Sequence, residues 1–292
     1  MSLRKLFRNI KLLSHIDLRS HTHEPIDLAQ VYDNLFYEIS DAVKNGDSHT
    51  VCGIMESLDF LIKSKASMVR FGDGEISLMC GDSIPFQSAS PLIATRLKQV
   101  LSACDKNLMV GIPSVLYKDK SCLQPYARDF WRNNGNKYRN ILEQYINFDK
   151  NTYYAAEMTL GFANRGIDKK AYFSGFRKIW NKKDIVIVCG KTVFDKITHN
   201  IFDNANSVEY VYAPSSDAFA KYDEIFNDCM KCAKNKIFVV ICGPTAKILC
   251  YDLFLNGRRA LDVGHIAKSY DWYMNHREID TLDSGIAFFA PD

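Results

Sequence analysis

Residues Ile237-Phe-Val-Val-Ile-Cys-Gly-Pro-Thr-Ala-Lys247 decide the fold class. The first six are apolar without alternation, which is typical of a strand buried on both faces of a parallel sheet. Gly243 ends this strand, and Pro244 suits the first position of a helix that we expect to run through Leu255. Ile185-Val-Ile-Val-Cys189 has the same continuous apolar character. The two runs predict the centre of a parallel sheet.

Further β-rich runs alternate with helical stretches along the chain. They are Ser67–Phe71, Leu108–Ile112, Thr152–Ala155, Val208–Tyr212 and Ala260–Val263. Strands that alternate with helices in this way predict an α/β fold with a doubly wound, mostly parallel sheet. Two helical patterns lie between Ile26 and Lys65. We therefore expect an N-terminal segment with a helical extension over residues 1–65, followed by one catalytic-size domain over residues 66–292.

Composition narrows the class of protein. The chain has 292 residues, of which 47% are apolar and 24% charged, so it is not a disordered chain. It contains no run of 18 apolar residues, so we expect no transmembrane helix. The net charge of +3 is small and the aromatic residues are not interleaved with a basic stripe, so we expect no nucleic-acid partner. Nine scattered cysteines suit a reducing compartment, which predicts a cytoplasmic protein.

The small net charge is concentrated at the start of the chain. Residues 1–24 hold five Lys or Arg and two acidic residues, which accounts for the whole net charge. Leu3, Leu6, Phe7 and Ile10 recur at helical spacing between these basic residues. One interpretation is a basic amphipathic helix that makes a peripheral contact with an anionic membrane surface. The alternative is a helix docked on its own domain, or a frayed end.

Ligands of open α/β sheets bind beyond the carboxyl ends of the strands, and the first such end carries acidic residues. In Met68-Val-Arg-Phe-Gly-Asp-Gly-Glu75 a strand leads directly into Gly72-Asp73-Gly74-Glu75, before a helix that we expect to begin at Ile76. Two carboxylates two residues apart on a tight turn can bind one hard cation. Arg70 supplies a positive charge suited to a diphosphate. The alternative is an ordinary Asp-Gly turn, with Glu75 favoured at a helix N-terminus.

Two other strand ends are candidates for chemistry. At Gly243-Pro244-Thr245, the start of a helix can bind an anion through backbone N–H groups and the Thr245 hydroxyl. In Ala260-Leu-Asp-Val-Gly-His-Ile266, Asp262 and His265 follow a strand, and a histidine there can bind a metal or transfer a proton. An ordinary strand-to-helix turn and a structural histidine are the alternatives.

These stretches resemble the bacterial GT-D-type glycosyltransferases, a family first described as a conserved domain of unknown function. The resemblance covers roughly residues 66–275, and its blocks occur in the family's order. The blocks are Arg70-Phe-Gly-Asp-Gly-Glu75, Ile84-Pro-Phe-Gln87, Leu108-Met-Val-Gly-Ile-Pro113, Phe202-Asp-Asn-Ala205, Ala218-Phe-Ala-Lys-Tyr-Asp-Glu-Ile225, Gly243-Pro-Thr-Ala246 and Asp262-Val-Gly-His-Ile266.

The resemblance implies a Rossmann-like fold and a DxE motif that works with Mn²⁺ or Mg²⁺. Asp73 and Glu75 would help to hold the cation and the donor's nucleoside diphosphate, and His265 is a further candidate metal ligand. Candidates for donor binding are Arg70, Phe71, Gly72, Gly74, Lys191, Gly243, Pro244 and Thr245. Asp217, Glu157 and Asp262 are the candidates for an acceptor base, with a front-face mechanism that needs no base as the alternative.

The chain departs from the family's pattern at two places. After the strand at 185–189 the family implies a loop with Gly and Arg, whereas this chain has Gly190-Lys191, in which the lysine can replace the arginine's charge. Near Tyr154 the family often carries an Arg-Pro pair, and this chain has Glu157. Both departures bear on the donor sugar and the acceptor.

We therefore expect a metal-dependent glycosyltransferase that moves a hexose from a nucleotide sugar, a UDP-sugar, to a hydroxyl of a glycan or glycoprotein precursor. Such an enzyme belongs to bacterial surface-glycan synthesis. A non-catalytic module that binds a nucleotide or sugar phosphate is one alternative. A metal-dependent phosphohydrolase is another, because the two carboxylates alone can also serve that chemistry.

Overall fold

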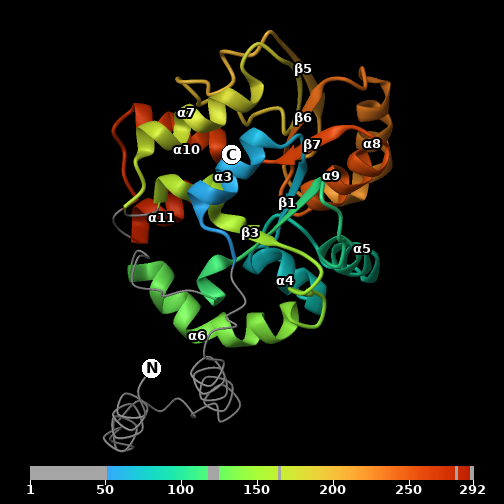
Figure 1. Ribbon diagram of the computed structural model, residues 1–292, viewed down its shortest axis with the longest axis vertical. Helices are drawn as coiled ribbons and strands as arrows, with labels where there is room; N and C mark the ends of the chain where they lie inside the picture. The colour runs from blue at the N-terminus through green and yellow to red at the C-terminus, as the bar shows by residue number, and fades with distance from the viewer. Residues whose placement is uncertain (1–50, 118–124, 164–165, 280–281, 290–292) are drawn as a thin grey trace, which may run out of the picture.

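A computed structural model describes residues 51–117, 125–163, 166–279 and 282–289 of the chain (Figure 1). In chain order the elements are α3 (Ile54–Lys63), β1 (Ser67–Arg70), α4 (Asp73–Cys80), α5 (Pro91–Leu101), β2 (Leu108–Ile112), η1 (Ser114–Leu116), α6 (Pro125–Leu142), β3 (Tyr153–Ala155), η3 (Ala156–Ala163), α7 (Lys169–Trp180), β4 (Asp184–Cys189), β5 (Ser207–Tyr212), η4 (Ala218–Lys221), α8 (Tyr222–Lys231), β6 (Ile237–Ile241), α9 (Thr245–Leu255), β7 (Arg259–Asp262), α10 (Ile266–Met274) and α11 (Leu282–Phe289).

The strands form one seven-stranded parallel sheet in the order β3-β2-β1-β7-β6-β4-β5. Val69 of β1 pairs with Val110 of β2, and Met68 of β1 pairs with Leu261 of β7. The first three strands are added from β1 in the interior of the sheet to β3 at one edge. The chain then crosses to the other half of the sheet, which β4 to β7 form. The strand order therefore reverses between β1 and β7, which is where sheets of this kind bind ligands.

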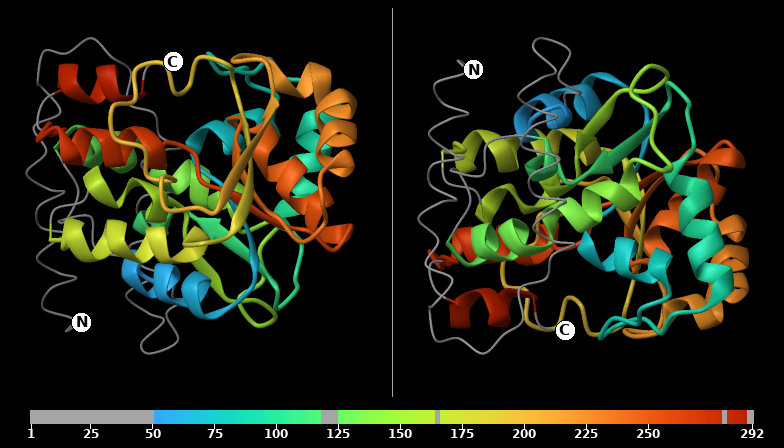
Figure 2. Two further views of the ribbon diagram at one scale, coloured as in Figure 1. Left: turned by 90° about the horizontal axis from the view of Figure 1, so that it is seen from above. Right: turned by 90° about the horizontal axis from the view of Figure 1, so that it is seen from below.

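Helices cover both faces of the sheet, as Figure 2 shows. Alternate residues of each strand point to opposite faces, so two hydrophobic clusters form. Val69, Val110 and Val240 lie in the cluster beneath α4, α5, α6, α8 and α9. Met68 and Leu261 lie in the cluster beneath α3, α7, α10 and α11. Burial on both faces explains why the strands have continuous apolar sequences.

The sequence-based expectations for the sheet are confirmed, including all seven strands, and two helix starts differ from them. α4 begins at Asp73, three residues before the expected Ile76, and α9 begins at Thr245 with Pro244 as its N-cap. The helix expected before the first strand is α3, which contributes Leu58 and Leu61 to the core. The rest of the predicted N-terminal segment, residues 1–50, lies outside the described residues.

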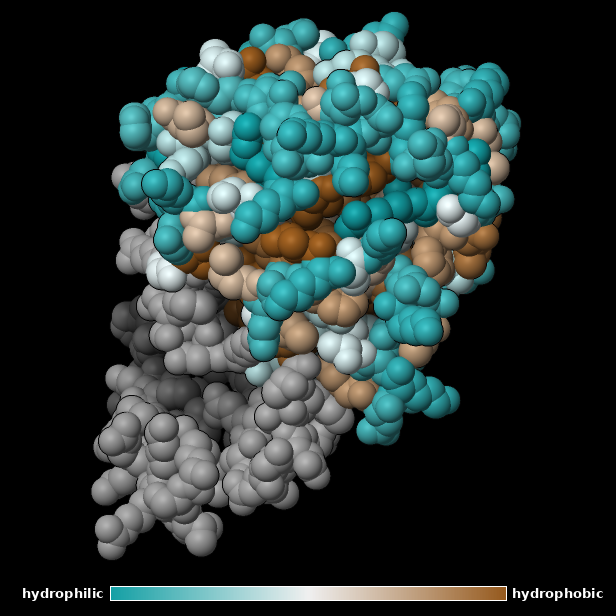
Figure 3. All heavy atoms as spheres, turned by 45° about the horizontal axis from the view of Figure 1, so that its top comes forward, coloured by the Kyte–Doolittle hydropathy of each residue, from teal (hydrophilic) through white to brown (hydrophobic). Residues whose placement is uncertain are grey.

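The surface in Figure 3 is mostly hydrophilic, with a band of hydrophobic side chains across it. Among the helices that the structure describes, none is both long and apolar enough to span a membrane.

Candidate functional site

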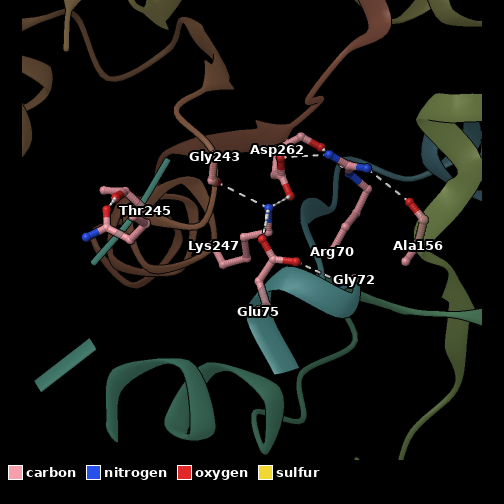
Figure 4. Close-up of polar contacts among 9 residues, drawn as sticks. Arg70, Gly72, Glu75, Ala156, Gly243, Thr245, Lys247 and Asp262 are labelled. Atoms are coloured by element: carbon pink, nitrogen blue, oxygen red, sulfur yellow. Dashed lines mark hydrogen bonds and ion pairs between the residues drawn. The ribbon is translucent and has the colours of Figure 1, made fainter. Parts of the chain in front are cut away.

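A buried ion pair joins the two strands at the reversal of strand order. Arg70 ends β1 and Asp262 ends β7, with Nη2 of the arginine 2.9 Å from Oδ1 of the aspartate. Nε of Arg70 donates to the backbone oxygen of Asp262 at 2.9 Å, and Nη1 donates to the backbone oxygen of Ala156 at 3.0 Å (Figure 4). All three guanidinium nitrogens therefore donate to protein acceptors. Arg70 ties β1, β7 and η3 together at this edge of the sheet.

The two acidic residues after β1 differ in burial. Asp73 and Glu75 both lie in the first turn of α4. Asp73 is exposed, whereas Glu75 is only 8% exposed. The Glu75 Oε2 atom accepts the N–H of Gly72 at 2.7 Å, which caps the helix. The structure thus places both residues in the first turn of a helix, where a turn before the helix was expected.

Lys247 on α9 joins the acidic residues of two strand ends. Its Nζ atom lies 2.9 Å from Oε1 of Glu75 and 3.3 Å from Oδ2 of Asp262. It also donates to the backbone oxygen of Gly243 at 3.2 Å. Figure 4 shows the ammonium pointing between these groups. The ends of β1, β6 and β7 are therefore connected by one buried set of charges, which we call the strand-end cluster: Arg70, Glu75, Lys247 and Asp262.

Two members of the strand-end cluster, Asp262 and Lys247, have pKa values shifted toward their ionised forms. Burial opposes ionisation of Asp262, but the Arg70 and Lys247 cations outweigh it and lower the pKa of this carboxyl. Burial also opposes the charge on Lys247, and the carboxylates of Asp262 and Glu75 outweigh it and raise the lysine pKa. Desolvation and, second, the charge of Glu75 raise the pKa of Asp73. Two cations balance two anions in the cluster, and Asp73 is an additional carboxylate beside it.

The start of α9 faces open space next to the cluster. Gly243 has a φ of +53°, a conformation that favours glycine, and a β-carbon there would meet nothing within 4 Å. Thr245 is buried, and its hydroxyl donates to Oε1 of Gln87 at 3.4 Å. Phe71, a predicted donor-binding residue that directly follows β1, is buried in the core. The Gly243 turn is therefore the open part of this strand end.

Each of the three predicted acceptor bases contacts other groups of the protein. Asp262 is part of the cluster. Oδ1 of Asp217 accepts the N–H of Ser88 at 2.6 Å, and this hydrogen bond lowers the aspartate pKa. Glu157 accepts hydrogen bonds from the N–H and the hydroxyl of Ser114.

Lys191 lies in a separate pocket. This pocket has a volume of about 420 Å³ and is lined by residues that follow β4 and β5 and by the start of α8, including Tyr212, Ser215 and Lys221. None of the residues of the strand-end cluster lines it. Lys191 therefore lines a pocket that the strand-end cluster does not line, although it follows β4, which pairs with β6 just before Gly243.

The carboxylates at the strand ends suit a cation that is bound partly by the protein and partly by a ligand. They do not suit a cation bound by protein side chains alone. Over the described ranges, no group of three or more His, Cys, Asp or Glu side chains is arranged to hold a metal ion. Both oxygens of Glu75 already have partners, and the ring of His265 lies 5.7 Å from that of Phe288, centroid to centroid. Mg²⁺ is commonly bound by one or two carboxylates plus substrate phosphates. Asp73 fits that arrangement as the protein's ligand.

Two residues of this region were missed by sequence reasoning. Lys247 lies one helical turn after Gly243 in an otherwise mostly apolar helix, and that isolated charge is the signal that could have found it. Gln87 connects three loops, because it contacts Thr245, Asp217 and the N–H of Phe219. Nothing local to Gln87 in the sequence indicates those contacts.

A parallel, doubly wound sheet with a charged cluster at its reversal point defines an α/β protein that binds its ligand at the strand ends. The family model described as "Glycosyltransferase GT-D fold" matches residues 68–282. The chain therefore belongs to the GT-D glycosyltransferase fold family, which confirms the resemblance seen in its sequence blocks.

Two curated relatives carry glycosyltransferase names. The chain is 32% identical over 235 residues to "Probable glycosyl transferase Gly" of Streptococcus gordonii, which covers 77% of this chain and 33% of that protein. It is 31% identical over 227 residues to "Glycosyltransferase GlyD" of Streptococcus pneumoniae serotype 4, which covers 76% of this chain and 27% of that protein. The chain thus spans a third or less of the length of these relatives.

Solved structures agree with the family assignment. One, described as "The highly conserved domain of unknown function 1792 has a distinct glycosyltransferase fold", has a TM-score of 0.73 and 33% identity, covering 83% of this chain and 91% of that one. Another, "A New Glycosyltransferase (DUF1792) from Streptococcus sanguinis", has a TM-score of 0.72 and 32% identity, covering 80% and 87%.

Proposed function

We propose that this chain transfers a hexose from a nucleoside-diphosphate sugar, a UDP-sugar, to a hydroxyl of a glycan or glycoprotein precursor. Membership of the GT-D family supports the reaction class. The observation that carries the proposal is the position of Asp73 beside the strand-end cluster. Within the part of the chain that the structure describes, the Asp73 carboxylate has no ion-pair partner, and it lies at the edge of the sheet where ligands of this fold class bind.

The residues around Asp73 suggest how a donor would be held. Asp73 would provide the protein's carboxylate to Mn²⁺ or Mg²⁺, with the donor's phosphates and water as the other ligands. A cation bound there supplies positive charge to the leaving diphosphate. The Gly243 turn offers the backbone at the start of α9 to the phosphates, since no side chain lies over it. Because the cluster itself is balanced in charge, the cation supplies the charge that a diphosphate needs.

The acceptor hydroxyl must lose a proton during transfer. Asp262 is ion-paired inside the cluster, and Asp217 binds the N–H of Ser88 with a lowered pKa, so both are weak proton acceptors. Glu157 is bound by Ser114. We therefore assign no general base, and a front-face mechanism without one is consistent with these contacts.

Nucleotide-sugar turnover by the full chain tests the proposal. A panel of UDP- and GDP-sugars with Mn²⁺ should give nucleoside diphosphate release, and Asp73→Asn should abolish it. Asp59→Asn is the matched control, because Asp59 is an exposed carboxylate on α3 that pairs with Lys63 away from the strand ends. Equal turnover by the two variants would refute the role of Asp73.

The same panel separates the alternatives. Nucleotide binding without turnover of any donor would favour a binding module. Phosphate release from a simple phosphate ester, independent of an acceptor, would favour a phosphohydrolase.

A membrane-linked acceptor is a further part of the proposal, motivated by the basic amphipathic pattern of residues 1–24. The chain should co-sediment with anionic vesicles and lose this on replacing Arg4, Lys5, Arg8 and Lys11 by glutamine. Unchanged sedimentation of that variant would count against peripheral membrane contact.

A further inference from the structure

The ammonium of Lys247 lies between acceptor groups from three segments of the chain. An ammonium has three N–H donors, and this one faces Oε1 of Glu75, Oδ2 of Asp262 and the backbone oxygen of Gly243 at 2.9, 3.3 and 3.2 Å. The lysine side chain is 7% exposed. Because its charge is buried and already faces two carboxylates, Lys247 is poorly placed to bind a donor phosphate directly.

The ion pair between Lys247 and Glu75 affects Asp73 through the N-terminal cap of α4. Oε1 of Glu75 is held by Lys247, and Oε2 accepts the N–H of Gly72 at 2.7 Å. Glu75 is thus fixed at both oxygens, and it fixes the start of α4 in turn. Asp73 directly follows Gly72, the N-cap residue, and is the first residue of α4. The direction in which Asp73 projects therefore depends on the cap.

The contact with Gly243 fixes the second half of the proposed donor site. The Gly243 turn begins α9 and faces open space, and its carbonyl is held by Lys247 from within the same helix. One side chain therefore sets both the α4 start and the α9 start, although these lie about 170 residues apart in the sequence.

We infer that Lys247 is a positioning residue for the proposed glycosyl transfer, which fixes Asp73 relative to the Gly243 turn by holding Glu75 in the α4 cap. The inference rests on the proposed function of this site. An alternative role is purely structural. Replacing a buried ion pair by apolar side chains is often neutral or stabilising, so stability alone does not require a lysine here.

Kinetics of Lys247→Met, Glu75→Gln and the double variant test the inference. Lys247→Met should raise the donor KM at least tenfold at a temperature where the variant is fully folded, because Asp73 and the Gly243 turn lose their common anchor. The double variant should be no worse than the worse single variant, because Lys247 acts through Glu75. Lys63→Met is the control, an exposed lysine on α3 paired with Asp59, and should leave KM unchanged.

Two results would overturn the positioning role. A lysine that only stabilises the fold would reduce the fraction of active enzyme, which lowers the apparent kcat and leaves KM within twofold of the wild-type value. A double variant whose loss is the product of the two single losses would show that Lys247 does not act through Glu75.

Amide hydrogen exchange at Gly72 separates this inference from the proposed function, because it needs neither donor nor metal. Exchange at this amide should accelerate at least tenfold in Lys247→Met, while Lys63→Met leaves it unchanged. A chain with no turnover of any donor refutes the proposed function whatever the exchange result. Unchanged exchange at Gly72 refutes the role of Lys247 even if the wild-type chain is an active transferase.

Discussion

Replacing Asp262 by asparagine removes the anion that two buried cations share. Asp262 is 1% exposed and pairs with Arg70 at 2.9 Å and with Lys247 at 3.3 Å. The variant leaves both cations buried with Glu75 as the only carboxylate of the strand-end cluster. Breaking a buried pair in this way costs about 3–5 kcal/mol, a large share of the roughly 5–15 kcal/mol by which domains are stable. For a chain of this size the melting temperature should fall by about 6–20 °C.

The effect of this substitution should depend on pH in a defined direction. Arg70 and Lys247 lower the pKa of Asp262 in the folded state, against the opposing effect of burial. A lowered carboxyl pKa gives stability that is present above the unfolded-state value of about 3.9 and is lost as the pH falls through the lower, folded-state value. The difference between wild type and Asp262→Asn should therefore be full at pH 7 and shrink only below about pH 4.

Thermal melting followed by circular dichroism between pH 7 and pH 3 measures both effects. Asp59→Asn is the control, because an exposed pair of this kind contributes about 0–1 kcal/mol. A melting temperature of Asp262→Asn within 2 °C of wild type at pH 7 would refute the reasoning. So would a difference that grows as the solution is acidified.

Four further predictions concern single substitutions, three of them near the strand ends and one, Gly81→Ala, at the C-terminal end of α4. Gly264→Ala should cost more than about 1 kcal/mol in a thermal melt, because φ is +48° and a β-carbon would lie 2.4 Å from a guanidinium nitrogen. Gly81→Ala, at φ +94° with open space around it, should cost less. Asp73→Asn should melt at or above the wild-type temperature at pH 7, since its raised pKa disfavours the ionised form, and this gain should vanish as the pH falls. Asp217→Ala should cost about 0.5–1.5 kcal/mol and speed hydrogen exchange at the Ser88 amide.

The fold could be predicted because its signals are local. Strands buried on both faces have continuous apolar sequences, and glycine or polar residues end them, so β2 (Leu108–Ile112) was predicted to the residue. The start of α4 was predicted too late. Gly-Asp-Gly is typical of a turn, whereas the backbone hydrogen bond from the Ile76 N–H to the Gly72 carbonyl, at 3.2 Å, shows that the helix already includes Asp73.

The sequence pointed to the strand ends at which the charged cluster lies, but the contacts among its charges could not be predicted. Arg70 was predicted as a ligand for diphosphate, and the structure shows its nitrogens donating to Asp262 and Ala156, which are 192 and 86 residues away. Lys247 belongs to a motif that the sequence singled out, yet its partner Glu75 lies on another helix. Such pairings depend on strand order, which local patterns do not contain.

A crystal structure of the full chain with UDP and Mn²⁺ would show where the donor's diphosphate binds. We predict that the diphosphate lies between Asp73 and the Gly243 turn, with Lys247 still bound to Glu75. A diphosphate bound elsewhere, such as in the pocket beside Tyr212, would contradict the proposed site.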